Sequence, residues 1–295
     1  MPIKHHYIPK FYSKRWAIYG GRLCEFSRPF KNKLMHQMVF PDETGFVRGL
    51  YEMQGLPGPL QDQFERLFLS PVDSKAAEAL NMMERGEMNW TADLRSGWTR
   101  FILTLLLRMP EDVADMKALA QWHFFHDEDV EKRYRSLRRE SDPDTWAMWV
   151  EKRDPHLVGN AAFRIAQKLM DHEKIGTDIN HFSWSLVKTD HCRFELLTSD
   201  RPVTMSSNLS LPDAFILLPI GPRRLFLACR EPFSVDSKRV EKLATLSNKH
   251  VVDGAVSYVY ATTSAARRYV EKNMGSQPVE RIVARLRRNR ENKPP

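Results

Sequence analysis

A single stretch, residues 92–110, decides the fold class of this chain: ADLRSGWTRFILTLLLRMP. Thr91 stands just before it and is a residue type favoured at helix N-caps. Apolar residues between Trp98 and Leu107 lie on nearly all sides of the expected helix, which is typical of a buried element. Pro110 disfavours helical geometry at the residue before it, so we expect the helix to end or kink there. The stretch therefore predicts a buried helix at the centre of the fold.

Helical patterns continue on both sides of this stretch, and β alternation lies beyond them. Helices are expected over about 60–86, 111–139, 144–153 and 156–173. Short strands are expected at 22–28 and 36–51, and again at 182–187, 193–197, 214–220 and 224–228. From Asp236 helices return through about Arg288.

This order predicts an α+β fold and not an alternating βαβ order. Short strands of the N-terminal part and of the C-terminal half would form a mixed or antiparallel sheet, with a large central helical block and C-terminal helices. We expect one domain over residues 1–278, with a helical insertion at about 60–173. Residues 279–295 would be a frayed basic tail.

The composition is that of a soluble protein. The chain has 295 residues, of which 42% are hydrophobic and 28% charged. No apolar run approaches the roughly 18 residues that span a bilayer, and the first residues lack the apolar region of a signal peptide. Cys24, Cys192 and Cys229 are odd in number and widely spaced, which argues against a disulfide framework. We therefore expect a cytoplasmic protein that is not bound to a membrane.

Positive charge is concentrated at the two ends of the chain. Residues 1–33 contain eight Lys or Arg and one Glu, a net charge of +7, within a total of +8. Residues 279–295 contain six Lys or Arg and two Glu, a net charge of +4. If the ends meet in the fold, they form a surface suited to phosphates or nucleic acid. The alternative is a solubilising surface with a basic tail.

The chain opens with residues 4–12, KHHYIPKFY, which are too rich in aromatic residues for a disordered terminus. We expect this segment to pack and to carry its histidines with it. Histidine suits proton transfer and metal binding. Adjacent side chains of a strand point to opposite faces, so one of His5 and His6 would face a site and the other would support it. A hydrogen-bonded structural pair is the equal alternative.

Three further positions are candidate site residues. Asp200 follows a predicted strand in the turn TSDRPV (198–203), where it could bind a metal, orient a histidine or anchor the turn itself. Arg108 ends the buried helix; it would pair with Glu65, bind a phosphate, or reach solvent at the helix end. Glu65 lies near an apolar helical stripe, and a solvated glutamate is the default for it.

Several familiar signatures are missing from the sequence. It contains no GxGxxG, GxxxxGK[ST], GxSxG or CxxC pattern. Nucleotide-driven motors, classical dehydrogenases and α/β-hydrolases therefore have no support, and no nucleotide cofactor is indicated.

Three pieces of the sequence, in this order, resemble an uncharacterised family of bacterial proteins known as a domain of unknown function. They are HHYIPKFY (5–12), the arginine-x-proline of residues 108–110 and TSDRPV (198–203). Leucine usually follows FY in the family and threonine usually separates the arginine from the proline; here Ser13 and Met109 stand in those places. The resemblance groups these residues but implies no reaction.

Together these features favour a hydrolase of phosphodiester or related phosphate substrates, nuclease-like in character. His5 or His6 would be a base, Glu65 a second carboxylate, and Arg108 a stabiliser of charge on phosphate. His6 and Asp200 would hold a divalent metal (Mg, Mn or Zn) if the reaction uses one. One rival is a non-catalytic nucleic-acid-binding module in which Tyr7, Phe11, Tyr12 and Trp16 stack on bases. The other is a structural or partner-binding protein with a buried polar network.

Overall fold

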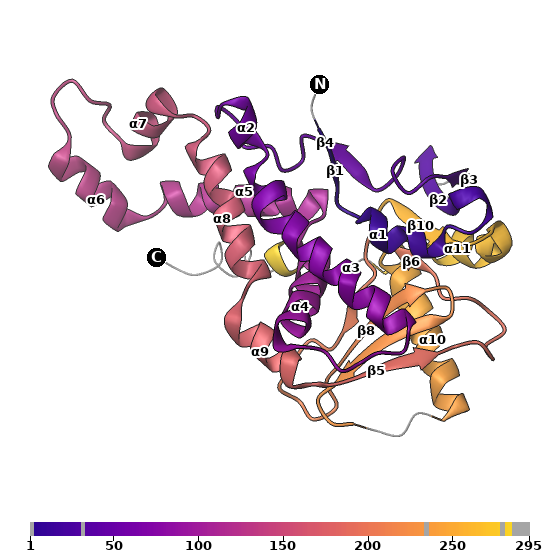
Figure 1. Cartoon of the computed structure of the whole chain (residues 1–295). Helices are drawn as coiled ribbons and strands as arrows, with labels where there is room; N and C mark the ends of the chain where they lie inside the picture. The colour runs from indigo at the N-terminus through magenta and orange to yellow at the C-terminus, as the bar shows by residue number, and fades with distance from the viewer. Residues whose placement is uncertain (1–2, 31–32, 233–235, 278–280, 285–295) are drawn as a thin grey trace.

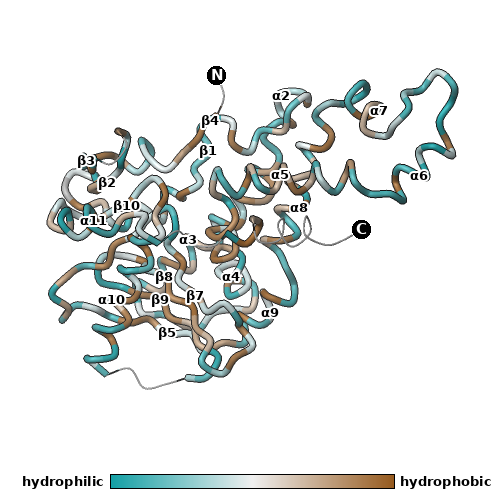
Figure 2. Tube along the Cα trace, turned by 180° about the vertical axis from the view of Figure 1, so that it is seen from behind, coloured by the Kyte–Doolittle hydropathy of each residue, from teal (hydrophilic) through white to brown (hydrophobic). Residues whose placement is uncertain are grey.

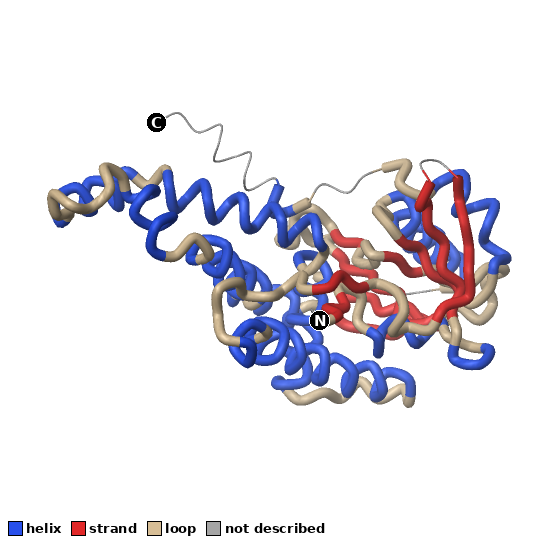
Figure 3. Tube along the Cα trace, turned by 90° about the horizontal axis from the view of Figure 1, so that it is seen from above, coloured by secondary structure: helices blue, strands red, loops and turns tan. Residues whose placement is uncertain are grey.

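The computed structural model describes residues 3–30, 33–232, 236–277 and 281–284, and its helices and antiparallel sheets confirm the α+β class. Most helices gather on one side of the molecule and most strands on the other, as the views from the front and from above show (Figures 1 and 3). The N-terminal strand lies between these two parts. This position puts the KHHYIPKFY segment where the helical and the β parts meet.

The buried central helix is α4 (Ala92–Leu107). It begins as predicted, because the Thr91 hydroxyl accepts a hydrogen bond from the Leu94 N–H at 3.2 Å. It ends at Leu107, and Pro110 is the first residue of α5 (Pro110–Phe125). Proline suits this position because the first helical N–H needs no partner within the helix. Pro110 thus marks both the end of one helix and the start of the next.

The remaining helices of the block follow the predicted order with two corrections, of which one is that α9 (Glu173–His181) was not expected. The helix expected over 111–139 is two helices, α5 and α6 (Glu128–Leu137). The Asp127 side chain accepts hydrogen bonds from the Asp129 and Val130 N–H groups and so starts a new helix. The other elements of the block are α2 (Gly58–Gln61), η3 (Glu65–Leu69), α3 (Ser70–Glu84), α7 (Trp146–Arg153), α8 (Leu157–Met170) and α9 (Glu173–His181).

Within the described residues, the strands form three antiparallel groups. A two-stranded sheet pairs β1 (Lys4–His6) with β4 (Phe46–Arg48). A four-stranded sheet has the order β3 (Lys33–Val39), β2 (Leu23–Phe30), β10 (Tyr258–Ala261), β6 (Thr198–Ser199). A second has the order β5 (Ser183–Lys188), β9 (Arg224–Cys229), β8 (Phe215–Gly221), β7 (Thr204–Met205).

The single strand expected at 36–51 is two strands, because β3 ends at Val39 and β4 begins at Phe46 in a different sheet. Two further strand predictions were wrong. The strand expected at 193–197 is irregular chain, and β5 pairs with β9 instead. The backbone there serves other groups: the carbonyls of Cys192 and Phe194 accept from the Arg223 guanidinium, and the Leu196 N–H donates to Pro222. The short strand β10 was missed inside a region expected to be helical, although its aromatic and β-branched residues are typical of strands.

One large hydrophobic core joins segments that are far apart in sequence. The Trp98 ring on α4 lies 5.5 Å from the Phe226 ring on β9, and Phe101 lies 5.2 Å from Phe11 of α1 (Lys10–Ser13). Tyr12, and Trp16 of η1 (Lys14–Trp16), are fully buried beside them. Hydrophobic colouring follows β8 and β9, whereas α6 at the far end of the helical part is mainly hydrophilic (Figure 2).

The C-terminal part packs against the sheets and the helical block. Helix α10 (Ser237–Asp253) leads to β10, and η4 (Ser264–Ala266) and α11 (Arg267–Asn273) follow. Within 281–284, Val283 is buried and Arg281 lies 2.7 Å from Asp115 of α5. This short piece of the expected tail is therefore docked, while the rest of 279–295 lies outside the described residues. Among the helices described, none is both long and apolar enough to cross a membrane.

Candidate active site

His5 points into the protein from β1 and uses both ring nitrogens. Its side chain is buried, and Nδ1 accepts a hydrogen bond from the Tyr51 N–H at 3.0 Å. Because Nδ1 is the acceptor, the proton belongs on Nε2, which donates to Asp62 Oδ1 at 2.5 Å. The imidazole is thus held in one tautomer between a backbone amide and a carboxylate. This arrangement positions Asp62 and leaves His5 no free nitrogen for a substrate.

His6 lies on the opposite face of β1, as the alternation of a strand requires. Its ring is half-buried and 5.4 Å from the Phe46 ring, and its Nε2 atom is buried without a hydrogen-bond partner in the described structure. Burial and the charge of Lys10 lower the pKa of His6 to about 4, although a hydrogen bond with the Asp42 backbone raises it. His6 is therefore neutral at pH 7.

Arg108 is completely buried and does not reach solvent at the end of α4. Its Nη1 and Nη2 atoms donate to the two oxygens of Asp73 at 2.8 and 3.1 Å, and Nη2 also donates to the His6 carbonyl at 3.1 Å. Although burial acts to lower it, the pKa of Arg108 is raised overall, with Asp73 as the largest opposing cause. The expected carboxylate partner exists, but it is Asp73 and not Glu65.

Glu65 begins η3, a single turn of π-helix, a geometry that often occurs at functional sites. Its side chain is half-buried, and Oε2 is buried without a hydrogen-bond partner among the described residues. Burial raises the pKa of Glu65, and the charge of Arg108 only partly offsets this. The solvated carboxylate expected as the default is therefore replaced by a carboxyl group that holds a proton more readily than usual.

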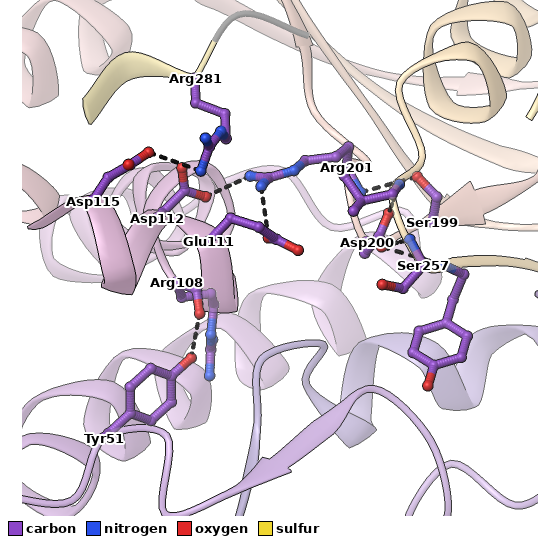
Figure 4. A network of polar contacts seen from close by, with 12 residues as sticks. Tyr51, Arg108, Glu111, Asp112, Asp115, Ser199, Asp200, Arg201, Ser257 and Arg281 are labelled. Carbon is purple, nitrogen blue, oxygen red and sulfur yellow. Dashed lines mark hydrogen bonds and ion pairs between the residues drawn. The ribbon is translucent and has the colours of Figure 1, made fainter. Parts of the chain in front are cut away.

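We call His5, Asp62, Glu65, Asp73 and Arg108 the inner polar cluster. The charges of the other four residues all act on the pKa of Glu65. Tyr51 completes it, because its hydroxyl donates to the Arg108 carbonyl at 2.5 Å and its N–H to His5 (Figure 4 shows Tyr51 and Arg108). Three of the five predicted residues therefore meet here: His5, Glu65 and Arg108. Two members were missed. Asp62 stands in the same short stretch as Glu65, and Asp73 precedes the Ala-rich part of α3.

Asp200 lies in a different set of contacts. It is 3% exposed, and its carboxylate accepts hydrogen bonds from the N–H groups of Val256, Ser257 and Tyr258 at 3.0, 2.5 and 3.2 Å. Burial raises the pKa of Asp200 to about 6, while these amide bonds act to lower it. The carboxylate ties the turn after β6 to the start of β10. None of the contacts in the described structure joins Asp200 to His5 or His6.

Arg201, next to Asp200, builds a second network that was not predicted from the sequence (Figure 4). Its guanidinium donates to Asp112 at 2.5 Å and to Glu111 at 3.1 Å, at the start of α5. Arg281 binds Asp115 one turn further along. The positions of these residues in the sequence could have indicated the network. Arg201 stands inside the TSDRPV turn, and the two acids directly follow the arginine-x-proline of residues 108–110. Two of the three motifs of the resemblance thus lie close together, joined by the hydrogen bonds from Arg201 to the acids that follow Pro110.

The contacts also bear on the metal and stacking expectations. Within the ranges that the structure describes, no three His, Cys, Asp or Glu side chains come together in a group that could hold a metal ion. The oxygens of Asp200 already accept three amides, so its pairing with His6 as a metal ligand has no geometric support. Tyr7, Tyr12 and Trp16 are buried in the core, so these three cannot stack on bases. Phe11 is half-buried against Phe101.

Comparison with known proteins gives a family but no activity. No curated protein and no solved structure matches the chain. One family does match, over residues 4–265, which include β1, the inner polar cluster and the Asp200 turn. Because the match spans most of the 295 residues, the chain belongs to the family described as protein of unknown function (DUF4238).

Proposed function

We propose that the protein is a hydrolase of phosphodiester or related phosphate substrates, with Glu65 and Arg108 at the reacting centre. One observation carries this proposal: Glu65 Oε2 and Arg108 Nε are both buried and have no hydrogen-bond partner among the described residues. One is an acceptor and the other a donor, on residues close enough to influence each other's pKa. An unpaired buried polar atom costs about 1–3 kcal/mol, so such a pair is expected where a ligand completes the site.

The chemistry follows from the state of each group. Glu65, with its raised pKa, would donate a proton to the leaving oxygen as the P–O bond breaks and water adds to phosphorus. The attacking water would lose its proton to the solvent, which would then reprotonate Glu65. Arg108 would stabilise the charge that develops on the phosphate oxygens. Asp73 fixes the guanidinium by its two hydrogen bonds. The His5–Asp62 hydrogen bond holds β1 against the end of α2, just before the π-helical turn that begins at Glu65. His5 is thus a positioning residue in this proposal.

The substrate class rests on charge. Lys4, Lys10 and Lys14 are exposed on the segment that carries His5 and His6, and residues 1–33 have a net charge of +7. Such a concentration of cations next to the cluster favours polyanionic substrates, with nucleic acid as the leading case. A divalent metal (Mg²⁺, Mn²⁺ or Zn²⁺) stays part of the proposal as an ion that would arrive bound to the substrate phosphates.

The test is cleavage of single- and double-stranded DNA and RNA by the full chain, with each of these metals and with EDTA. We expect cleavage by the parent and a loss of at least about 100-fold for Glu65→Gln, the scale of general acid catalysis. Glu78→Gln on α3 is the matched control, since Glu78 is 59% exposed. The hydrolase proposal fails if no substrate is cut, or if Glu65→Gln cuts as fast as the parent.

A non-catalytic nucleic-acid-binding module is the second candidate, favoured by the same exposed lysines. It now depends on Lys4, Lys10 and Lys14 and not on aromatic stacking, because three of the four aromatic side chains named for it are buried. Salt-dependent binding without cleavage, weakened by Lys10→Gln and Lys14→Gln and unaffected by Glu65→Gln, would favour this candidate. A structural role predicts instead that variants of the cluster change stability alone.

A further inference from the structure

A pocket away from the inner polar cluster is lined by residues of α10, η4, α11 and the 193–197 segment. Helices α10 and α11 lie on the β side of the molecule (Figure 1). Its volume is about 520 Å³, within the range of small-molecule sites. Phe194, Leu197, Ala266 and Tyr269 give it an apolar lining, and Arg193 and Arg223 add two guanidinium groups. An apolar body with a few convergent polar groups is the usual composition of a ligand site.

The two arginines differ in how they are held. Arg223 is fixed, because its Nη1 donates to the carbonyls of Cys192 and Phe194 at 2.8 and 2.9 Å. Its Nε and Nη2 atoms take part in none of the hydrogen bonds of the described chain. Arg193 is exposed and makes no hydrogen bond or ion pair within the described residues. The pocket thus offers one preorganised and one free guanidinium.

The acid on the lining is already occupied. Glu195 accepts hydrogen bonds from both the N–H and the hydroxyl of Thr262, so its carboxylate does not pair with either arginine. With two guanidinium groups and one carboxylate, the lining has an excess of one positive charge. Guanidinium groups bind carboxylates and phosphates through paired hydrogen bonds.

From this geometry we propose that the pocket binds a small organic anion. The planar apolar body of the ligand lies against Tyr269, and its carboxylate or phosphate group binds Arg193 and Arg223. The site is independent of the proposed hydrolase activity, since none of the inner cluster residues lines it. A ligand of about 13 non-hydrogen atoms should bind with a dissociation constant on the order of 1 mM or tighter.

The experiment is calorimetric titration of the full chain with 2-naphthoate, 2-naphthyl phosphate and the neutral 2-naphthamide. We expect both anions to bind at least about tenfold more tightly than the amide, a difference of about 1.4 kcal/mol. Arg193→Gln should remove that difference, while Arg133→Gln on the exposed face of α6 should keep it. Thr245→Trp, which places bulk on an exposed position of α10 that lines the pocket, should abolish binding.

Three outcomes would count against the site. Equal affinity for the anions and the amide, or unchanged affinity in both Arg193→Gln and Thr245→Trp, would show that the arginines and the pocket do not recognise the ligand. No binding of either anion at several millimolar would overturn the proposal. A preference of one anion over the other identifies the ligand class as a carboxylate or a phosphate.

Discussion

Glu65 and Asp200 are two carboxylic acids whose pKa values are raised by burial, but their surroundings differ. Asp200 gives its oxygens to three backbone N–H groups and closes a turn. Glu65 is half-buried on a π-helical turn, and its Oε2 has no hydrogen-bond partner in the described structure. Burial alone therefore does not identify a site. What separates the two is whether the hydrogen-bonding capacity of the group is already used, and this makes Glu65 the stronger candidate for chemistry.

The largest expected effect is on the structural support of Glu65. Arg108→Ala should lower the free energy of unfolding by about 3 kcal/mol, because it removes a fully buried guanidinium and leaves the 19% exposed Asp73 carboxylate without its partner. Arg100→Ala is the matched control on the same helix, where the Arg100–Asp171 pair is 42% and 45% exposed. That variant should lose about 0–1 kcal/mol. Urea denaturation measures both, and equal losses would mean that Arg108 is not the internal anchor described here.

The second effect separates catalysis from stability at Glu65. Glu65→Gln should leave the free energy of unfolding at pH 7.5 within about 1 kcal/mol of the parent, because Glu65 Oε2 makes no hydrogen bond within the described residues that the change could remove. A raised pKa means that the ionised group is disfavoured in the folded protein, so removing the charge does not weaken the fold. A Glu65→Gln variant that keeps its melting temperature but loses cleavage supports a chemical role. A marked loss of stability would show instead that Glu65, like Asp200, is a structural anchor.

Asp200 should behave in the opposite way. Asp200→Ala removes the acceptor of three N–H groups and should cost about 2–3 kcal/mol of unfolding free energy. Asp190→Ala, at an exposed acid paired with Arg224, should cost about 0–1 kcal/mol. If the Asp200 variant folds at low temperature and still cleaves, the residue is an anchor. Full loss of activity in a protein of unchanged stability would contradict that assignment.

The difference between local patterns and contacts with distant residues explains what the sequence could predict. The buried helix with Thr91 at its N-cap, and the β8–β9 pair, follow from local periodicity and turn residues, which depend on neighbours along the chain. The π-helical turn at Glu65 could not be predicted, since its spacing looks like that of an ordinary helix. The 193–197 segment has strand-like alternation, but its carbonyls are taken by Arg223, a residue about thirty positions away.

The candidate site shows the same limit. Residue types drew attention to His5, Glu65 and Arg108, and these three do meet in the fold. Their partners Asp62 and Asp73 are ordinary helix-region acids in the sequence, and only the three-dimensional contacts distinguish them. For Asp200 the sequence left both a site role and a turn-anchoring role open. The amides of residues 256–258, which lead into the unpredicted strand β10, occupy its carboxylate.

The smallest expected effect concerns pH, where His6 and Asp200 act with opposite sign. The pKa of His6 falls to about 4 in the folded protein, so between pH 6.5 and 4 the unfolded chain binds the extra proton and stability drops as pH falls. After discounting for the partial exposure of His6, this loss is about 1 kcal/mol. The pKa of Asp200 rises to about 6, so its folded carboxyl binds the proton first and stability drops as pH rises from 4 to 6.

Unfolding measured from pH 4 to 7 separates the two contributions. His6→Gln should reduce the loss of stability as the pH falls below 6.5. Asp200→Asn should reduce the loss of stability as the pH rises from 4 to 6. His36→Gln, at an exposed histidine, is the control. If His6→Gln leaves the acid limb unchanged, the ring is protonated in the folded protein. The assignment of a neutral imidazole beside Lys10 would then be wrong.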